Sequence, residues 1–344
     1  MAEVVIYSDP LFEKHDTGYG HPECPERLSV SRVALDESGL LETVKVVSPR
    51  DATVQEIELV HSSRYIEQVE RLAKSGGGNL DMDTPVSPAT YSAALKAAGA
   101  VLQGVDWCFE DSSRRAFCMV RPPGHHALPA RGMGFCVFNN IAMGARYAMS
   151  RAFANRVMIV DWDSHHGNGT QDVFYEDQNV LYLSLHQYPH YPGTGGIDET
   201  GAGKGNGYTI NLPFPAGTGE AHYLEAFERV VIPVAQEFKP DLVMVSAGYD
   251  SHAEDPLCSM RLIDSSYRKM TDYLVEFSED YCDGRLLIIL EGGYNLSAQA
   301  HSVVQTVAEL AGIEIPAKDK APLPTAYPEK AGDVVARLSR TNWS

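Results

Sequence analysis

Short apolar runs alternate with longer segments of mixed polarity along most of the chain. The apolar runs are rich in branched residues and predict strands at Val4–Tyr7, Ala116–Val120, Val157–Val160, Val180–Leu185, Leu242–Ser246 and Leu286–Leu290. The longer segments predict helices at Glu26–Glu37, Ser87–Val105, Asn139–Ala152, Ala221–Phe238 and Ser265–Glu279. Several runs are apolar throughout, which is typical of parallel strands covered on both faces. The pattern therefore predicts an α/β fold with three layers, α/β/α, around a central, mostly parallel sheet.

The same pattern indicates one domain rather than two. The chain contains no internal repeat and no long Pro/Ser linker, and its 344 residues suffice to bury a large core. Gly76–Gly78 and the glycine-rich stretch Pro192–Gly207 are expected to be loops. After about Ile315 the composition turns rich in Pro, Lys and Ala. We therefore expect a main domain over residues 1–315 and a C-terminal extension over 316–344, packed on that domain or trailing from it.

Polar residues follow five of the predicted strands directly. They lie in Arg121–Ala127, Asp161–Gly169, His186–Gly195, Gly248–Asp255 and Glu291–Tyr294. In open parallel sheets, functional residues lie in the loops beyond the carboxyl ends of the strands. We therefore expect these five segments to converge on one rim of the sheet.

The segment Asp161–Gly167 has the residue types of a metal site. Residues two apart lie on one face of an extended segment, so Asp163 and His165 can point to a common centre. Carboxylate oxygen and imidazole nitrogen suit Zn²⁺, and a catalytic zinc ion takes three protein ligands and keeps a position open. Asp250, which follows another strand, is the expected third ligand. A lone Asp or His in a turn is usually only solvated, but three at strand ends favour metal binding.

Two other segments carry groups suited to hydrolysis. Two His-His doublets, 125–126 and 165–166, each follow a predicted strand and adjoin a glycine. An imidazole can take a proton from water and return it to a leaving amine near neutral pH. In Glu291–Tyr294 two glycines allow a sharp turn, and the hydroxyl of Tyr294 could donate to a developing oxyanion. Each of these segments alone would be weak support for a hydrolytic site.

Charge and cysteine content narrow the class of protein. Lys and Arg number 28 and Asp and Glu 46, a net charge of −18. This charge argues against nucleic acid or anionic lipid as a partner and would attract cationic substrates. The six cysteines form no C-x-x-C pair, which excludes thiolate zinc knuckles and thioredoxin-like sites. The opening MAEVVIYSDP does not resemble a secretory signal and no apolar run approaches ~20 residues, so we expect a cytoplasmic protein that does not enter a membrane.

Taken together, these segments resemble the zinc-dependent histone deacetylases and acetylpolyamine amidohydrolases of the arginase/deacetylase superfamily. The matching segments occur in family order over roughly residues 5–310. They are 21–28 (HPECPERL), Asp83-Thr84 with Ser87-Pro88, 121–127 (RPPGHHA), 134–136 (GFC) with Asn139-Asn140, 161–170 (DWDSHHGNGT), 192–195 (PGTG), 246–250 (SAGYD) with Asp255-Pro256, and 291–294 (EGGY). The combination is far more specific than any single segment, and it implies the arginase/deacetylase fold.

The resemblance implies a catalytic role for particular residues. Asp163, His165 and Asp250 would bind Zn²⁺, with Fe²⁺ as the alternative metal. His126, paired with Asn168, would act as general base and then general acid. His125 would be a second imidazole, tuned by Asp161. Tyr294 would polarise the acyl carbonyl and stabilise the tetrahedral intermediate.

The resemblance also implies binding roles. A structural K⁺ beside the zinc would be held by Asp161, Asp163, His165, Ser184 and Leu185. Gly134 would accept a hydrogen bond from the substrate amide through its carbonyl, and Phe135 and Tyr191 would enclose the methylene chain. Asp83 would hold the substrate backbone at the rim, Leu257 would stand at the gatekeeper position, and Arg27 would lie near the foot of the pocket.

Three departures bear on the subgroup and the substrate. Asn168 stands where one branch of the family has Asp, and Glu291 where that branch has Gly. Both features resemble class II deacetylases and their bacterial relatives. Leu257 replaces the acidic gatekeeper of the eukaryotic polyamine-specific member and offers no partner to a secondary ammonium. The resemblance therefore favours acetyl-lysine in peptides or proteins as substrate.

Other functions stay open at this point. An acetylpolyamine or other small amide would use the same chemistry and would suit the net charge equally well. A binding protein for acyl-lysine that lacks catalysis is less favoured, because every residue needed for turnover is present. A two-metal, arginase-like hydrolase is also less favoured, because a second set of bridging carboxylates is missing from these segments. The oligomeric state, including a homo-oligomer, is left open.

Overall fold

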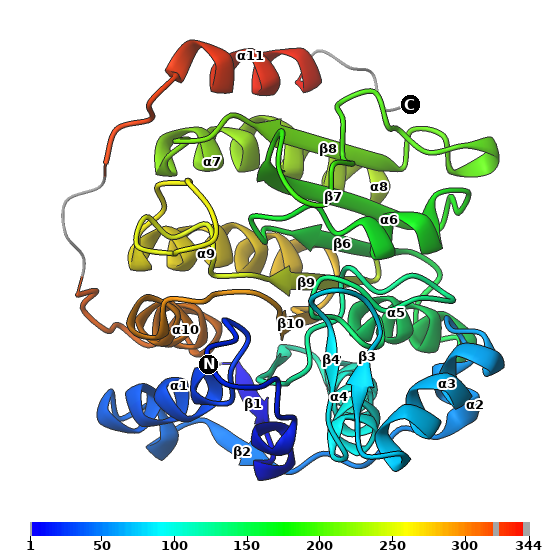
Figure 1. Ribbon diagram of the computed structural model, residues 1–344. Coiled ribbons are helices and arrows are strands. Elements are labelled where there is room, and N and C mark those ends of the chain that lie inside the picture. The colour runs from blue at the N-terminus through cyan, green and yellow to red at the C-terminus, as the bar shows by residue number, and fades with distance from the viewer. Residues whose placement is uncertain (1, 319–322, 340–344) are drawn as a thin grey trace.

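An eight-stranded sheet forms the centre of the fold, with strand order β2-β1-β5-β10-β9-β6-β7-β8 (Figure 1). The computed structural model describes residues 2–318 and 323–339. The strands of this sheet are Glu3–Tyr7 (β1), Lys45–Val47 (β2), Arg114–Cys118 (β5), Val157–Asp161 (β6), Val180–Gln187 (β7), Thr209–Phe214 (β8), Leu242–Ala247 (β9) and Leu286–Leu290 (β10). Every pairing in it is parallel. A separate antiparallel ladder joins Gly78–Asn79 (β3) to Pro85–Val86 (β4).

Helices cover both faces of the sheet. On one face lie Glu26–Glu37 (α1), Asp264–Tyr281 (α9) and Leu296–Ala311 (α10), and on the other lie Thr90–Glu110 (α4), Asn140–Ser150 (α5) and Asn168–Phe174 (α6) (Figure 1). The central strands β6, β9 and β10 are buried along their whole length, because helices exclude water from both sides. The predicted three-layer α/β/α architecture with a parallel sheet is confirmed.

Five adjacent strands explain how distant polar segments can meet. In the sheet, β5, β10, β9, β6 and β7 are consecutive neighbours, although β9 and β10 come last among them in the chain. These are the five strands whose carboxyl ends carry the predicted polar segments. Since parallel neighbours end at the same edge, all five segments lie at one rim.

Several predicted boundaries are corrected by the structure. The predicted strand Ala116–Val120 is Arg114–Cys118, the predicted helix Ser87–Val105 is Thr90–Glu110, and Gly78 begins β3 instead of lying in a loop. The predicted helix Ala221–Phe238 is α7 (Glu220–Ala226), a π-helical turn (Phe227–Val231) and α8 (Ile232–Phe238) in succession. Elements that were not predicted are β2, β8, α10, the β3–β4 ladder, α2 (Val54–Ile57), α3 (Ser63–Lys74), α6, α11 (Pro328–Leu338) and the 3₁₀ turns Pro10–Lys14, Leu40–Glu42 and Gly203–Gly205.

The C-terminal helix α11 packs beside β8 and α7 at the edge of the sheet (Figure 1). Its buried residues Ala331, Val335 and Leu338 face the main body of the fold. The preceding segment is tied down as well, because Ala326 N donates to Gly217 O at 2.9 Å. The predicted division at residue 315 stays a prediction, and residues 319–322 and 340–344 of the predicted extension lie outside the described residues. Within the described ranges, no helix is both long enough and apolar enough to cross a membrane.

Candidate active site

Three donor groups predicted to bind a metal meet at the rim of the sheet. Asp163 and His165 follow β6, and Asp250 follows the neighbouring β9. Nδ1 of His165 lies 2.8 Å from Oδ2 of Asp250 and 3.2 Å from Oδ1 of Asp163. One ligand atom from each residue lies within 4.8 Å of the others, and all three side chains are buried. The structure thus brings the predicted metal ligands together.

The electrostatics of this group suit a cation. Burial by itself lowers the pKa of His165, but the carboxylates of Asp163 and Asp250 outweigh it and raise that pKa to about 10. Two buried carboxylates therefore stabilise positive charge at this position. A donor set of two carboxylate oxygens and one imidazole nitrogen fits Zn²⁺ or Fe²⁺ and leaves coordination positions for other molecules.

Local backbone geometry fixes these side chains before any ion binds. Ser164 N donates to Oδ1 of Asp250 at 2.8 Å, and Gly292 N donates to Oδ2 of Asp163 at 2.9 Å. Gly248 lies against the carboxylate of Asp163, where an added Cβ would come within 2.1 Å of Oδ2. Glycine is therefore required at this position for β9 to approach the Asp163 segment.

The two imidazoles of the segment after β5 lie beside the metal ligands and have different partners. Nδ1 of His125 is 3.0 Å from Oδ2 of Asp161, and its Nε2 is 3.8 Å from Oδ2 of Asp163. Nδ1 of His126 is 2.8 Å from Oδ1 of Asn168. The rings of His125 and His126 are 4.0 Å apart, and that of His126 is 6.0 Å from His165.

These partners push the two histidine pKa values in opposite directions. For His125, burial lowers the pKa, but Asp163 and Asp161 outweigh it and raise the pKa to about 10. For His126, burial and then the positive charges of His125 and His165 hold the pKa well below its usual range. One imidazole is therefore protonated and its neighbour neutral near pH 7. Such a split suits acid and base tasks in one site.

Tyr294 is held in place by its backbone. Oδ2 of Asp255 accepts hydrogen bonds from Tyr294 N at 2.7 Å and from Asn295 N at 3.2 Å. The ring of Tyr294 lies edge-on to Phe135 at 5.6 Å. Burial and then the charges of Asp163 and Asp250 raise the pKa of the phenol well above its usual value, so its hydroxyl keeps its proton. A protonated hydroxyl can donate a hydrogen bond to a bound carbonyl.

Aromatic rings surround this group, and exposure falls steeply inward. Tyr191 is 37% exposed, His165 is 9% exposed and Asp163 is 1% exposed. The ring of Tyr191 lies 5.2 Å from that of His126, and the ring of Phe135 contacts that of Tyr294. Such walls suit an apolar methylene chain that reaches inward from solvent.

Gly134 and Phe135 shape one of these walls through an unusual backbone conformation. Both have positive φ, 56° and 67°, which is uncommon for Phe. A Cβ at Gly134 would lie 2.5 Å from Cδ2 of His126, so only glycine fits. Thr84, next to Asp83, accepts a hydrogen bond from Phe135 N at 3.1 Å. Asp83 lies between β3 and β4, and its carbonyl lies 3.2 Å from Nε2 of His21, whose ring packs on Phe135 at 4.7 Å.

His190 is a residue of the site that sequence reasoning missed. Its ring stacks on His165 at 4.9 Å, and its Nε2 lies 3.2 Å from the carbonyl of Leu257. His190 therefore contacts both the predicted metal ligand His165 and the backbone of the half-buried Leu257. Asp255, which anchors Tyr294, was noted only as part of a matching segment. His190 follows β7 among aromatic residues and carried no signal of its own.

The residues predicted to hold potassium lie together at the ends of β6 and β7. Asp161 is the register partner of Ser184, and Leu185 follows in the same strand. Oδ1 of Asp161 accepts from Asp163 N at 3.2 Å. The occupancy of this site stays a prediction.

Arg27 belongs to a buried ionic network below the site. It donates to the carbonyls of Glu291 at 2.5 Å and Gly293 at 2.7 Å, and its Nη1 lies 3.0 Å from Oε1 of Glu23. The carboxylate of Glu291 accepts from Gly124 N at 2.7 Å and from His125 N at 3.1 Å. The network therefore links the segment that carries Tyr294 to the segment that carries the two histidines.

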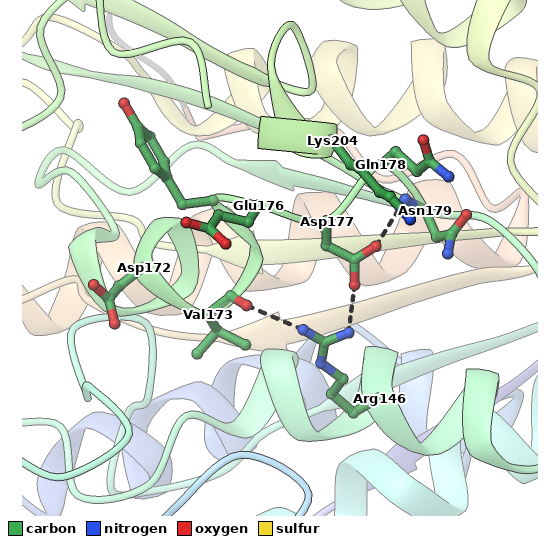
Figure 2. A pocket seen from close by; sticks show the side chains of 9 residues that line it. Arg146, Asp172, Val173, Glu176, Asp177, Gln178, Asn179 and Lys204 are labelled. Atoms are coloured by element: carbon green, nitrogen blue, oxygen red, sulfur yellow. Dashed lines mark hydrogen bonds and ion pairs between the residues drawn. The ribbon is translucent and has the colours of Figure 1, made fainter. Parts of the chain in front are cut away.

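A polar hollow of about 580 Å³ lies elsewhere, between α5, the end of α6 and the start of β7 (Figure 2). Its guanidinium group is already satisfied, since Arg146 pairs with Asp177 and donates to Val173 O at 3.1 Å. The lining carries no imidazole and no thiol. It therefore lacks the imidazole groups that are present at the rim.

Comparison with known proteins places this geometry in a family. The model of the histone deacetylase domain matches residues 21–310. The histone deacetylase-like amidohydrolase of Pseudomonas aeruginosa is 36% identical over 301 residues, covering 87% of this chain and 79% of its own. The polyamine deacetylase HDAC10 of Danio rerio is 42% identical over 327 residues, covering 91% of this chain and 46% of its own.

A solved structure agrees with the sequence comparison. The crystal structure of the HDA15 HD domain superposes with a TM-score of 0.90 at 34% identity, covering 99% of this chain and 95% of that chain. The family match spans the segments that carry Asp163, His165, Asp250, both site histidines and Tyr294. The chain belongs to the histone deacetylase domain family and is an amidohydrolase of the deacetylase type.

Proposed function

We propose that this enzyme removes acetyl groups from acetyl-lysine side chains in peptides or proteins. The observation that carries the proposal is the convergence of Asp163, His165 and Asp250 with the His125–His126 pair and Tyr294. These groups supply a cation site, a neutral base and an oxyanion donor within one aromatic-walled space.

Zn²⁺, or Fe²⁺ as the alternative, would be held by Asp163, His165 and Asp250, and when bound it acidifies water and polarises a carbonyl. We also propose K⁺ at the site formed by Asp161, Asp163, His165, Ser184 and Leu185.

His126 is the proton carrier in this proposal. Because Nδ1 of His126 faces the amide oxygen of Asn168, Nδ1 carries the proton and Nε2 is free to accept one. Nε2 takes a proton from water as the water oxygen bonds to the acyl carbon. When the carbon–nitrogen bond breaks, the same proton passes to the leaving nitrogen, giving the lysine amine and acetic acid, which then loses its proton to become acetate.

His125 and Tyr294 stabilise the charge that develops. The Tyr294 hydroxyl donates to the oxygen of the former carbonyl, and protonated His125 adds positive charge nearby. Asp161 holds His125 in its protonated form and fixed orientation. Gly134 would accept the amide N–H of the substrate, and Phe135 and Tyr191 would flank its methylene chain.

The substrate class rests on Leu257. Its backbone carbonyl lies 3.2 Å from Nε2 of His190, whose ring stacks on His165, so residue 257 is part of the site wall. The resemblance puts a carboxylate at this position in the polyamine-specific enzyme, and leucine stands there in this chain. Leucine gives no electrostatic benefit to a secondary ammonium. An acetylpolyamine remains the second candidate, because a relative is named a polyamine deacetylase. The cytoplasmic location and the oligomeric state stay predictions.

The test is a substrate panel on purified protein with measured metal content. We expect kcat/KM for an acetyl-lysine peptide to exceed that for acetylputrescine by at least about tenfold, roughly 1.4 kcal/mol of transition-state discrimination. Activity should vanish with chelator and return with Zn²⁺ or Fe²⁺. A clear preference for acetylputrescine would overturn the substrate assignment, and binding of acetyl-lysine peptide without turnover by metal-loaded protein would overturn the enzymatic one.

A further inference from the structure

A second group of metal-binding side chains lies beside the first and shares no residue with it. His125, Cys136 and Glu291 each offer a ligand atom within 4.8 Å of the others, and all three are buried. They come from the segment after β5, the loop before α5 and the end of β10. A nitrogen, a sulfur and an oxygen donor therefore meet at one point in the interior.

Hydrogen bonds to the backbone hold this group in position. Glu291 accepts from Gly124 N and His125 N, and its other oxygen accepts from Ser246 Oγ at 3.2 Å. Cys136 is fixed by its N–H bond to Met133 O at 3.0 Å. Nδ1 of His125 is engaged by Asp161, so Nε2 is the nitrogen that can bind a metal ion, in exchange for its proton.

Two of the three groups, Glu291 and Cys136, can exchange a proton for a metal ion. Among the described residues, Glu291 forms no ion pair with Lys or Arg, although its side chain is fully buried. Burial raises its pKa to about 7, against the opposing effect of His125. For Cys136, burial and then the charge of Glu291 raise the pKa of the thiol, while the backbone N–H of His126 favours the thiolate. A metal ion can replace the protons on both groups.

The donor types indicate which ions fit. Thiolate and imidazole ligands select Zn²⁺, Co²⁺ or Fe²⁺ over Mg²⁺ and Ca²⁺, which prefer oxygen alone. We propose that His125, Cys136 and Glu291 form a second, inhibitory site for a transition-metal ion such as Zn²⁺. An ion there occupies Nε2 of His125, and this imidazole can then no longer take part in the reaction. Binding replaces a proton on each group that carries one, Nε2 of His125 included.

Cobalt gives a test that does not depend on turnover. Co²⁺ bound to a thiolate produces a near-ultraviolet charge-transfer band, whereas the oxygen and nitrogen donors of Asp163, His165 and Asp250 do not. We expect no such band at one equivalent of Co²⁺ and a band at excess Co²⁺. The band should be lost in Cys136→Ser and in Cys136→Ala. It should persist in Cys258→Ser and Cys24→Ser, which remove the two half-buried thiols.

Activity supplies the second readout. Each variant is loaded with one equivalent of Zn²⁺, and its activity is taken as its own baseline before more Zn²⁺ is added. The wild type should lose activity at excess Zn²⁺, and Cys136→Ser should raise the inhibitory midpoint by at least about tenfold. A missing band, a band that survives in Cys136→Ser, or one lost in Cys258→Ser would overturn the site. Unchanged inhibition in Cys136→Ser would overturn its inhibitory role. Since the spectrum needs no substrate, a wrong substrate assignment would leave this result intact.

Discussion

The side-chain oxygen of Asn168 lies 2.8 Å from Nδ1 of His126. Asn168 is the first residue of α6, so the segment that carries Asp163 and His165 also positions this oxygen. A neutral amide fixes the orientation of the imidazole without adding charge. The pKa of His126 is therefore set by burial and by the neighbouring cationic imidazoles, both of which lower it.

Asn168→Asp should move the acid limb of the kcat/KM profile to higher pH. A carboxylate at this distance favours protonated His126, and an opposite charge this close typically raises a pKa by about one to three units. The base must be neutral to accept a proton, so the fraction of enzyme with neutral His126 becomes large only at higher pH. The profile is measured with an acetyl-lysine peptide at fixed metal content.

The matched control is Asn179→Asp, which makes the same change of charge at an exposed position. Its profile should coincide with that of the wild type. An acid limb that stays in place or moves to lower pH in Asn168→Asp would contradict the role of His126 as the base.

Tyr294→Phe should lower kcat by about 10²–10³-fold, the typical cost of losing one oxyanion donor. The backbone anchor to Asp255 and the contact with Phe135 do not involve the hydroxyl, so the fold and metal content should be unchanged. Tyr281→Phe, on the exposed side of α9, serves as control. Near-normal turnover with full metal content would show that the carbonyl is polarised without Tyr294.

The sequence predicted the central sheet well and its edges poorly. The strands β6, β7, β9 and β10 are apolar runs because helices cover both of their faces. The edge strand β8 contains Asn211 and Pro213, which interrupt the apolar pattern, and the opposite edge strand β2 is three residues long and largely exposed. Such strands owe their conformation to pairing with a neighbour, which the local pattern does not record.

Two of the helices that were not predicted, α10 and α3, differ in the signal that their sequences carry. In α10 the buried residues include Gln299, Ser302 and Thr306, so no clean apolar stripe is visible. Gln299 is buried because it bonds to Arg27, 272 residues earlier in the chain. By contrast, α3 has a serine cap at Ser62 and an apolar face, a readable signal that was overlooked.

In the site, the sequence predicted the residues whose side-chain chemistry is distinctive. It did not predict the roles of residues that support these side chains through contacts in the folded structure. Asp163, His165 and Asp250 were predicted as a set and lie together. His190 stacks on His165, and Asp255 accepts a hydrogen bond from the backbone of Tyr294. In both pairs the two residues come from loops that follow different strands and meet at the rim. Spacing along the chain carries no record of such contacts.

Leu257→Glu should shift specificity toward polyamines. A carboxylate at residue 257, whose backbone carbonyl contacts His190, would attract the secondary ammonium of acetylspermidine. We expect the ratio of its kcat/KM to that of an acetyl-lysine peptide to rise by about tenfold. Leu257→Gln is the matched control, because it has the same size as the glutamate without the charge. An equal change of ratio in both variants would assign the effect to shape, and no change in either would place Leu257 outside the substrate path.

The buried carboxylate of Glu23 should make stability depend on pH in a defined window. It accepts hydrogen bonds from Arg121 and Arg27 with no exposure to water. Burial raises its pKa, but Arg121 and then Arg27 outweigh burial and hold the pKa at about 2, below the ordinary value of 4.5. A depressed pKa in the folded state stabilises the protein above about pH 4.5, and this contribution is lost as the pH falls toward 2.

Glu23→Gln should therefore lower the free energy of unfolding by about 3–5 kcal/mol at pH 7, because it leaves two buried arginines without their counter-ion. The difference in the free energy of unfolding between the variant and the wild type should shrink between pH 4.5 and pH 2. In this range Glu23 takes up a proton in the unfolded wild type before it does so in the folded one, which destabilises the wild type. Urea unfolding at pH 7 and pH 3.5 measures both values. Glu67→Gln, which removes an exposed pair with Arg71, should cost no more than about 0.5 kcal/mol at either pH. If the Glu23→Gln difference is the same at both pH values, its cost comes from lost packing, and the ionic network does not govern acid stability.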